Sequence, residues 1–589
     1  MYDRIGSEVA LLRRAWQEFS RSAPSSPDVD RLPADSRGDP DVERLFEGFA
    51  FLAAQVRERI EDELPEVIHD LAEILVPSLL RHVPACSVVE FTPRADMVRK
   101  RIRVARDETE LAALEDRSAT PGGRGEIRFR TTADLDLLPV AIHQTALDLS
   151  RGGAPVLRIQ ARAPQAALPA VFEKDGLRIF IHGEYPTAAS LALLVARHLA
   201  AVEVRGLGKG GRVVSLDPRS VRLVGFDPDF PLLPWPRLAP QGYRTIQEYF
   251  TLREKLLFFD IRDLHLAREV AEERFEVVLR FSEGAPALVG RMESVALRTN
   301  CSPVVNLSRA PADPVQIDVL GQRALLRTSP SGGAEIYSVE SVSRIPTRPG
   351  ERRVRLDPFS AFRSGQAPGA IQYRLRRVAA RGGGGIDTFL SVVSAADAGH
   401  PPGPMTLSVD TTVTNPRPAA SLRVGSIDVA TESSPTQATF TNILPVSLAV
   451  PPPLGTGLPW RLVSHLGLAR GSLGSAAALR DLLHLYNFRA STGDPTGEQN
   501  RRRIDAILEV RTTGERRLVG GDPVRGVHCE IGLDDAPFQG AGDAFLFCSA
   551  IDELLAARAG VNSFVRLSVL FKSGRRYDWA PRAGARVLV

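Results

Sequence analysis

The stretch Asp39–Leu80, DPDVERLFEGFAFLAAQVRERIEDELPEVIHDLAEILVPSLL, predicts two consecutive amphipathic helices. Asp39 can accept a hydrogen bond from a backbone N–H at the helix start, and Pro40 suits the first helical position, where its missing donor would be unpaired anyway. Apolar residues then recur at spacings of 3 and 4 and line one narrow stripe, namely Val42, Leu45, Phe49, Leu52 and Val56. A stripe of this kind packs helix against helix.

The same spacing occurs on both sides of this first helix. It appears earlier at Ile5, Val9, Leu12, Trp16 and Phe19, and again after Pro65 at Ile68, Leu71, Leu75 and Leu79. We therefore expect three amphipathic helices in the first part of the chain. Their stripes either pack on one another and on the rest of this chain, or meet another polypeptide. The partner-interface candidates are Ile5, Leu12, Trp16, Phe19, Leu45, Phe49 and Leu52.

The composition is that of an ordinary globular protein. Of 589 residues, 43% are apolar and 24% charged, and the length suggests about four domains. The four cysteines are scattered without CxxC spacing, which predicts neither a zinc site nor a disulfide framework. Because 74 basic residues nearly balance 70 acidic ones without a block of like charge, no nucleic-acid partner is predicted.

No targeting or membrane signal is visible. The N-terminus carries charged residues where a signal peptide would place its apolar run, and the most apolar stretch, Ala188–Val204, is interrupted by Arg197 and His198. We therefore expect neither export nor a membrane span.

After the helical opening, short alternating runs bounded by Gly and Pro predict strands. These runs are 127–130, 156–161, 177–182, 276–281, 406–413, 422–429, 527–533 and 563–571. Three helices are predicted in this part of the chain. One spans 187–201, with Thr187 as its cap and Leu199 on its apolar face, a second follows Ser475, which caps it, and a third spans 543–559.

Because the strands come in groups, this pattern favours an α+β fold over alternating βαβ units. We expect a multidomain chain in which N-terminal amphipathic helices are followed by β-rich mixed domains. The predicted parts are an N-terminal helical region (1–88), an α+β domain (89–240), a β-rich middle domain (241–440) and a C-terminal α+β domain (441–589).

The sequence contains no recognisable catalytic constellation. Gly206–Arg212, GLGKGGR, lacks the spacing and hydroxyl residue of a phosphate-binding loop, so a flexible turn is the better interpretation. There is no HExxH motif, and His465 and His484 are expected to be hydrogen-bonded core imidazoles. Asp534 and Asp535 fit a turn in which carboxylates bond the local backbone. We therefore predict no catalytic residue, metal or cofactor and no enzymatic activity, although acid and base residues from distant segments can still converge.

The segment Gly242–Ile261 is dense in aromatic residues, namely Tyr243, Tyr249, Phe250, Phe258 and Phe259. Such residues can form a ligand platform or a protein interface, but they more often surround a helix and a strand in a core. We predict core.

Several blocks resemble, in order, the TssF (VasA) family of type VI secretion baseplate subunits. They are DPDVERLFEGFAFLAAQV and LVPSLLRHVPACSVVEF between Asp39 and Phe91, GFDPDFPLLPWP at Gly225–Pro236, GYRTIQEYFTLREKLLFFDI at Gly242–Ile261, TNCSPVVNL at Thr299–Leu307, EIYSVESV at Glu335–Val342, WRLVSHLGLARGSLGSAAALRDLLHLY at Trp460–Tyr486 and NSFVRL at Asn562–Leu567. The series covers nearly the whole chain. The chain departs from the family wording at Ser20–Gly38, at Gly321–Ala334, and at Ala469 and Arg470, where the family more often has an Asn.

This resemblance implies a structural wedge component of a contractile injection machine, similar to the wedge proteins of phage baseplates, with no reaction catalysed. It implies TssG, TssE, TssK and a second copy of the chain as partners, beside tail tube, hub and sheath components. It also implies a cytoplasmic bacterial location, in a baseplate docked to the inner-membrane complex. The alternative is an enzyme or ligand-binding protein of the bacterial envelope with a cleft in the β-rich middle, which requires convergent carboxylates or histidines.

Overall fold

The computed structural model divides into two compact units, Met1–Ile74 and Leu75–Val589. It describes residues 72–73, 76–94, 97–114, 125–148, 154–208, 212–236, 239–282, 292–318, 322–328, 334–346, 351–359, 371–380, 385–394, 404–454, 474–519, 522–560, 562–583 and 586–587. The predicted helices before residue 72 lie outside these ranges. The end of the third predicted helix is corrected: Leu79 lies in a short 3₁₀ turn, Pro77–Leu80, because Pro77 cannot donate the hydrogen bond that would continue an α-helix.

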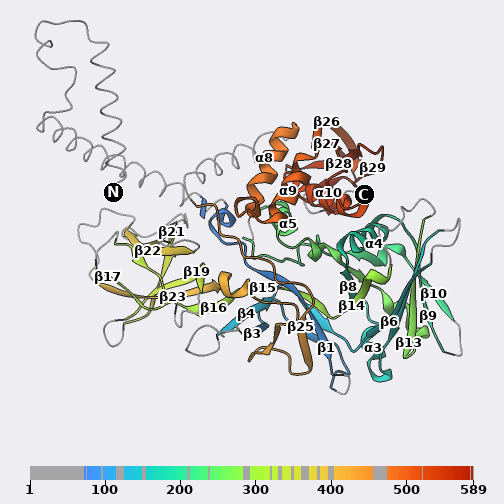
Figure 1. Ribbon diagram of the computed structural model, residues 1–589, viewed down its shortest axis with the longest axis horizontal. Coiled ribbons are helices and arrows are strands. Elements are labelled where there is room, and N and C mark those ends of the chain that lie inside the picture. The colour runs from blue at the N-terminus through green and yellow to red at the C-terminus, as the bar shows by residue number, and fades with distance from the viewer. Residues whose placement is uncertain are drawn as a thin grey trace, which may run out of the picture. The chain divides into compact units, whose positions relative to one another are not determined.

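A six-stranded sheet is built from segments far apart in the sequence (Figure 1). Its order is β24 (Ile427–Ala430), β3 (Glu110–Leu114), β4 (Glu126–Thr131), β15 (Cys301–Val305), β1 (Cys86–Pro93) and β25 (Ala438–Asn442). On β1, Cys86 pairs with Val305 of β15, and Val89 pairs with Asn442 of β25. The buried side chains of Phe91, Phe129 and Phe440 share one core cluster on this sheet.

Two further sheets contribute to the largest hydrophobic core, to which helices α4 (Tyr185–Arg197), α5 (Gln241–Thr251), α8 (Ala476–Tyr486) and α10 (Ala541–Ala556) also contribute. The first contains β10 (Val213–Leu216), β9 (Leu199–Gly206), β13 (Arg274–Phe281), β7 (Val156–Arg162) and β6 (Ala141–Asp148). The second contains β11 (Val221–Leu223), β12 (Phe258–Ile261), β8 (Leu177–Gly183) and β14 (Val295–Thr299). A small pair, β2 (Ile102–Val104) with β5 (Leu135–Leu137), instead buries Val104, Leu135 and Leu137 in the core cluster of the six-stranded sheet.

An eight-stranded sheet has its own, smaller core. Its strands are β16 (Ser308–Pro311), β23 (Met405–Thr414), β19 (Glu335–Arg344), β20 (Val354–Pro358), β21 (Ile371–Ala379), β22 (Ile386–Ser394) and β18 (Ala324–Leu325), and β17 (Val315–Ile317) pairs with β23. His82 follows the 3₁₀ turn, and its Nε2 lies 3.0 Å from the Glu335 carboxylate at the start of β19. This contact ties the eight-stranded sheet to the segment that leads into β1.

The last sheet contains β26 (Ile507–Val519), β27 (Asp522–Leu533), β28 (Ser563–Phe571), β30 (Arg582–Ala583) and β31 (Arg586–Val587), and β29 (Arg576–Asp578) pairs with β28. Helices α8 (Ala476–Tyr486) and α9 (Pro495–Asp505) precede it. Strands β27 and β28 are parallel and are connected by the long helix α10 (Ala541–Ala556). Ser475 caps α8 by accepting a hydrogen bond from the Ala478 backbone N–H at 3.2 Å, as predicted.

The described residues are β-rich, with several sheets and few helices, and most predicted strands are confirmed. Two element predictions are wrong in detail. Helix α4 spans Tyr185–Arg197, Thr187 does not cap it, and Leu199 belongs to β9 because the chain turns into the five-stranded sheet directly after His198. The strand predicted at 422–429 is confined to β24, since Leu422 lies in a turn after the short helix α6 (Pro416–Ala419).

The four-part domain division stays a prediction. In the six-stranded sheet, β3 and β4 of the predicted α+β domain share hydrogen bonds with β24 and β15 of the predicted middle domain, and β1 itself crosses the predicted boundary at residue 88. Within the described residues, no helix is both long enough and apolar enough to cross a bilayer.

Candidate functional site

The aromatic segment Gly242–Ile261 forms helix α5 (Gln241–Thr251), a 3₁₀ helix η4 (Arg253–Leu257) and β12. Its five aromatic side chains are buried, which confirms the prediction of core. Tyr243 stacks on Tyr486 of α8 with ring centroids 5.6 Å apart, and Tyr249 packs on Phe547 of α10 at 5.5 Å. The segment therefore joins the C-terminal helices to the sheets of the large core.

A buried ion cluster centred on Glu248 fixes this segment to the proline-rich loop before it. One Glu248 oxygen accepts hydrogen bonds from the Leu232 and Leu233 backbone N–H groups at 2.7 and 3.0 Å, and the other accepts from Lys255 Nζ at 2.6 Å. Arg244 Nε lies 3.4 Å from the same carboxylate. Burial opposes ionisation of Glu248, but the positive charges of Lys255 and Arg244 and these hydrogen bonds outweigh it, so the pKa of Glu248 is lowered.

A second buried ion cluster surrounds Asp543 at the start of α10. Asp543 Oδ2 accepts from Arg503 Nη2 of α9 at 3.0 Å and from the Gln539 backbone N–H at 3.0 Å, while Oδ1 accepts from Tyr185 Oη at 3.1 Å. Arg253 of η4 stacks over the Tyr185 ring, 3.6 Å from its centroid. Burial and the Asp543 charge raise the pKa of Tyr185, so its hydroxyl remains a donor. One carboxylate therefore links α4, α9 and α10.

Helices α4 and α5 each cross α10 so closely that glycine is required at both contacts. A Cβ on Gly542 of α10 would lie 2.2 Å from the Ala189 carbonyl oxygen of α4. A Cβ on Gly242 of α5 would lie 2.3 Å from the Glu553 carbonyl oxygen of α10. With α5 and α4 both held against α10, this part of the molecule is a rigid frame rather than a site with a free reactive group.

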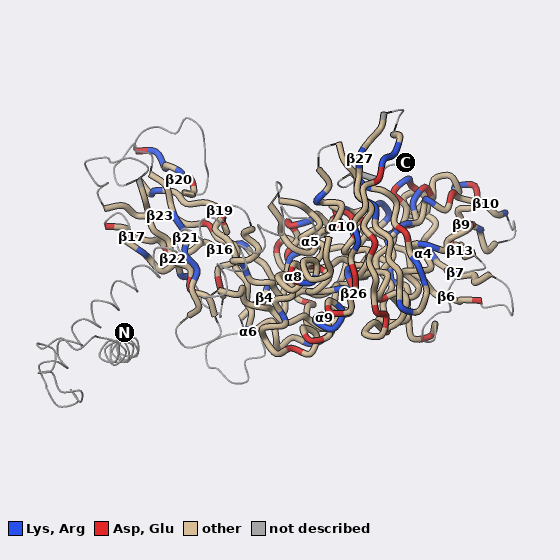
Figure 2. Tube along the Cα trace, turned by 90° about the horizontal axis from the view of Figure 1, so that it is seen from above, with Lys and Arg blue, Asp and Glu red and all other residues tan. Residues whose placement is uncertain are grey.

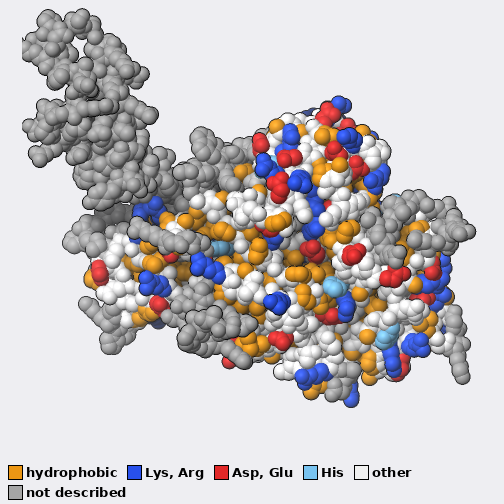
Figure 3. Space-filling model, viewed as in Figure 1, with side chains coloured by type: hydrophobic (Ala, Val, Ile, Leu, Met, Phe, Trp, Pro, Cys, Tyr) orange, Lys and Arg blue, Asp and Glu red, His pale blue; other side chains and the backbone are white. Residues whose placement is uncertain are grey.

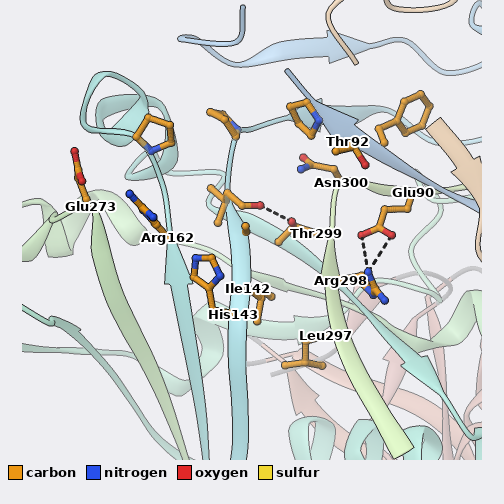
Figure 4. Close-up of a pocket in the computed structure, with 16 residues that line it drawn as sticks. Glu90, Thr92, Ile142, His143, Arg162, Glu273, Leu297, Arg298, Thr299 and Asn300 are labelled. Carbon is orange, nitrogen blue, oxygen red and sulfur yellow. Dashed lines mark hydrogen bonds and ion pairs between the residues drawn. The ribbon is translucent and has the colours of Figure 1, made fainter. Parts of the chain in front are cut away.

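The alternative function requires a cleft, and the described residues contain one of about 570 Å³ between β1, β6 and β14. Figure 4 shows its charged lining residues as sticks. At one end Glu90 pairs with Arg298 at 3.2 Å, and Glu273 lies at the opposite end, beyond Arg162. The two carboxylates therefore do not converge, and His143 lies between them on β6 beside neither. This geometry offers no acid and base pair.

Metal binding and reactive thiols have no support in the described part of the chain. No group of three or more His, Cys, Asp or Glu residues there can hold a metal ion. The four cysteines are buried and free, and burial raises the pKa of Cys529 to about 12. In the predicted turn at Gly206–Arg212, the Gly208 backbone N–H donates to the Glu272 carboxylate. This N–H is therefore already bound to an acidic side chain of the same protein and is not available to a phosphate.

The two predicted core histidines have different outcomes. His465 lies outside the described residues. His484 is hydrogen-bonded as predicted, since its Nε2 lies 3.1 Å from Asp505 Oδ1 of α9, but its side chain is 33% exposed and so is only half-buried. Asp534 does bond its local backbone, accepting from the Ala536 N–H at 3.0 Å.

All seven partner-interface candidates, from Ile5 to Leu52, lie outside the described residues, so they stay predictions.

Sequence reasoning missed both ion clusters. The sequence signals that could have found them were Glu248 and Lys255 within an aromatic segment, and Asp543 at the start of an otherwise apolar helix.

On the face seen in Figure 3, basic and acidic side chains are interspersed and do not gather into a single basic stripe.

The sequence comparisons with known proteins cover nearly the whole length of this chain. The sequence model of the family described as "Type VI secretion system, TssF" matches residues 2–586. The type VI secretion system component TssF1 of Pseudomonas aeruginosa is 28% identical over 639 aligned positions, covering 100% of this chain and 99% of that protein.

Two solved structures are similar to this chain. A chain from a type VI secretion TssK-TssF-TssG baseplate subcomplex has a TM-score of 0.76 and 31% identity, covering 93% of this chain and 99% of its own. A chain from a structure of the type VI secretion baseplate complex has a TM-score of 0.58 and 25% identity, with 100% of both chains covered.

Proposed function

Because this chain belongs to the type VI secretion system TssF family, and is thus a component of the secretion baseplate, we propose that it acts as a wedge subunit joining TssG-type and TssK-type partners. The family consists of structural baseplate subunits. The observation that carries the proposal is the likeness, over 93% of this chain, to a chain solved in a TssK-TssF-TssG assembly.

The physical features of the described residues support a structural role. Two buried ion clusters and two glycine-dependent helix crossings make the frame around α4, α5 and α10 stiff. A subunit that transmits load between neighbours needs such a frame, whereas an enzyme needs free groups that converge on a cleft. The cleft at Glu90 and Glu273 supplies no such pair.

The N-terminal stripes are the proposed adhesive surface of this subunit. In this proposal Leu45, Phe49 and Leu52 bury their side chains against helices of a TssG-type protein and of a second copy of this chain. A TssE-type protein and the tube, hub and sheath components complete the proposed neighbours. The assembly takes place at the cytoplasmic side of the inner membrane, where the baseplate docks.

Co-purification tests the proposal. The full chain is expressed with TssG-like and TssK-like proteins from the same organism, and the complex is isolated through a tag on the TssG-like protein. We expect this chain to elute in a complex whose mass contains more than one copy of it. The variant Phe49→Asp with Leu52→Asp is expected to be lost from the complex, because two charges placed on the stripe cannot be buried unpaired.

The matched control is Glu47→Ala, which lies between stripe positions on the predicted opposite face of the same helix. It is expected to leave the complex intact. A wild-type chain that remains monomeric beside its TssG-like protein would overturn the proposed function. A complex that survives Phe49→Asp with Leu52→Asp would overturn the assignment of the stripe alone.

A further inference from the structure

The hairpin formed by β26 and β27 has two faces with different electrostatics. The strands pair antiparallel along their whole length, and within the described residues β26 has no partner on its other side. Near the body of the sheet, Val510, Cys529 and Ile531 are buried in the core that α10 helps to form. Farther out, residues 511–518 lose this cover, and all but Glu515 are exposed. Figure 2 shows β27 projecting beyond the neighbouring elements.

The outer face of this hairpin carries charges that are paired. Arg511 Nε donates to Glu509 at 2.6 Å, and Arg517 Nε donates to Glu515 at 2.8 Å. Glu515 also accepts from Arg566 of β28 at 2.9 Å. This face is therefore electrostatically satisfied without any partner.

The opposite face carries two arginines that have no partner among the described residues. Arg516 of β26 stands directly across from Arg525 of β27 in the strand register. Both side chains are exposed, and neither forms an ion pair or hydrogen bond with another described residue. Like charges directly opposite each other in a sheet are destabilising. The arginine pair therefore costs the isolated protein free energy that an external anion would recover.

Apolar surface flanks the arginine pair on the same face. Leu518, opposite Pro523, is 74% exposed, and Val527, opposite Gly514, is 38% exposed. A Cβ built on Gly514 meets no atom within 4 Å, so the space above the strand is open. We name Gly514, Arg516, Leu518, Arg525 and Val527 the distal hairpin face.

We propose that the distal hairpin face binds an acidic, partly apolar segment of another protein of the assembly. A carboxylate of that segment lies between Arg516 and Arg525, where two guanidinium groups can bind it in forked geometry. An apolar side chain of the same segment covers Leu518 and Val527. The inference rests on the proposed function in one respect, namely that this chain works within a multi-subunit assembly.

The test places a photo-crosslinking amino acid at Leu518 in the full chain, in cells that carry the complete secretion system. The crosslinked peptide is sequenced by mass spectrometry. We expect a protein segment that contains Asp or Glu next to an apolar residue. In the variant Arg516→Gln with Arg525→Gln, we expect the crosslinking yield to fall on the order of tenfold, because both partners of the carboxylate are removed.

The control variant is Arg511→Gln with Arg517→Gln, which removes the same number of charges from the satisfied face of the hairpin. Its crosslinking yield is expected to stay unchanged. The Tm of the isolated chain gives a second readout: Arg516→Gln with Arg525→Gln is expected to leave it unchanged or raise it, because like-charge repulsion is relieved. A merely structural role of the two arginines predicts a lower Tm instead.

Several results would overturn the proposal. They are the absence of a crosslink, a crosslinked segment without acidic residues, a crosslink to nucleic acid or lipid, and a yield that survives Arg516→Gln with Arg525→Gln. Co-purification of the TssG-like protein is measured in the same samples. If it persists when the crosslink fails, only this inference is wrong, whereas its loss in the wild type counts against the proposed function.

Discussion

Replacing Asp543 with asparagine tests whether the ion cluster at the start of α10 holds the molecule together. The substitution keeps the size and shape of the side chain, so no cavity is created. It removes the negative charge that faces Arg503, whose side chain is buried to 1% exposure. An amide oxygen at the Oδ2 position can still accept from the Gln539 backbone N–H, and an amide NH2 at the Oδ1 position can donate to the Tyr185 hydroxyl, which then acts as acceptor.

The magnitude follows from leaving Arg503 charged and uncompensated. Breaking a buried ion pair by removing one partner costs about 3 to 5 kcal/mol. The bond from Arg503 Nη1 to Asn500 Oδ1, at 3.3 Å, remains and offers only a neutral acceptor. We therefore expect Asp543→Asn to lower the free energy of unfolding by roughly 3 to 5 kcal/mol.

Urea unfolding followed by tryptophan fluorescence measures this change. Trp579 reports on α10, since its ring stacks on Phe545 at 5.8 Å and its Nε1 donates to Ser549 at 3.3 Å. The control is Asp505→Asn, because Asp505 pairs with His484 at the surface and an exposed pair contributes about 0 to 1 kcal/mol.

A second substitution separates the charge effect from local distortion. Adding Arg503→Met to Asp543→Asn removes the stranded charge, so the double variant should regain most of the lost stability. If Asp543→Asn costs no more than Asp505→Asn, the buried charge of Asp543 does not stabilise this region. If Arg503→Met makes the Asp543→Asn protein still less stable, the stranded charge of Arg503 is not the cause of the loss.

Three further outcomes are expected. Gly542→Ala should cost about 1 to 3 kcal/mol or more in urea unfolding, because its new methyl group overlaps α4, whereas Gly514→Ala should change stability by no more than about 0.5 kcal/mol. Burial raises the pKa of Asp552 to about 7, above its unfolded value near 4, so the folded state binds the proton more tightly and this residue's contribution to the free energy of unfolding falls as pH rises from about 4 to 7. Asp552→Asn should flatten that fall in pH-dependent thermal melts, and an unchanged slope would contradict the assignment. Burial also raises the pKa of Cys86 and Cys548, so a thiol reagent should label them only at the rate of unfolding, and rapid labelling of the native chain would show that they are accessible.

The sequence predicts the single elements of the described residues well where periodicity alone decides them. The strands β7, β8 and β28 and the buried face of α8 follow directly from alternation and helical spacing. The prediction fails where a neighbouring segment decides instead. The helix predicted to run to residue 201 ends at Arg197, because Leu199 is drawn into pairing with β13.

The candidate site was less predictable than the fold. Glu248 and Lys255 are seven residues apart in one segment, but the backbone groups of Leu232 and Leu233 that complete their cluster lie in a separate loop. Arg503 and Asp543 belong to different helices, and no local pattern relates them. Family resemblance, by contrast, could be read directly from blocks such as Gly242–Ile261, and the match over residues 2–586 confirms it.

The position of β1 between β15 and β25 governs when this protein can finish folding during synthesis. Val89 of β1 meets its partner Asn442 only after the ribosome has added about 350 more residues, which takes on the order of 20 to 70 s at bacterial rates. Throughout that interval the emerging strand has an open hydrogen-bonding edge, which is the kind of surface that aggregates. We expect a nascent subunit of this kind to need chaperone protection, and a chain cut short before Asn442 to be degraded because one edge of β1 stays unpaired.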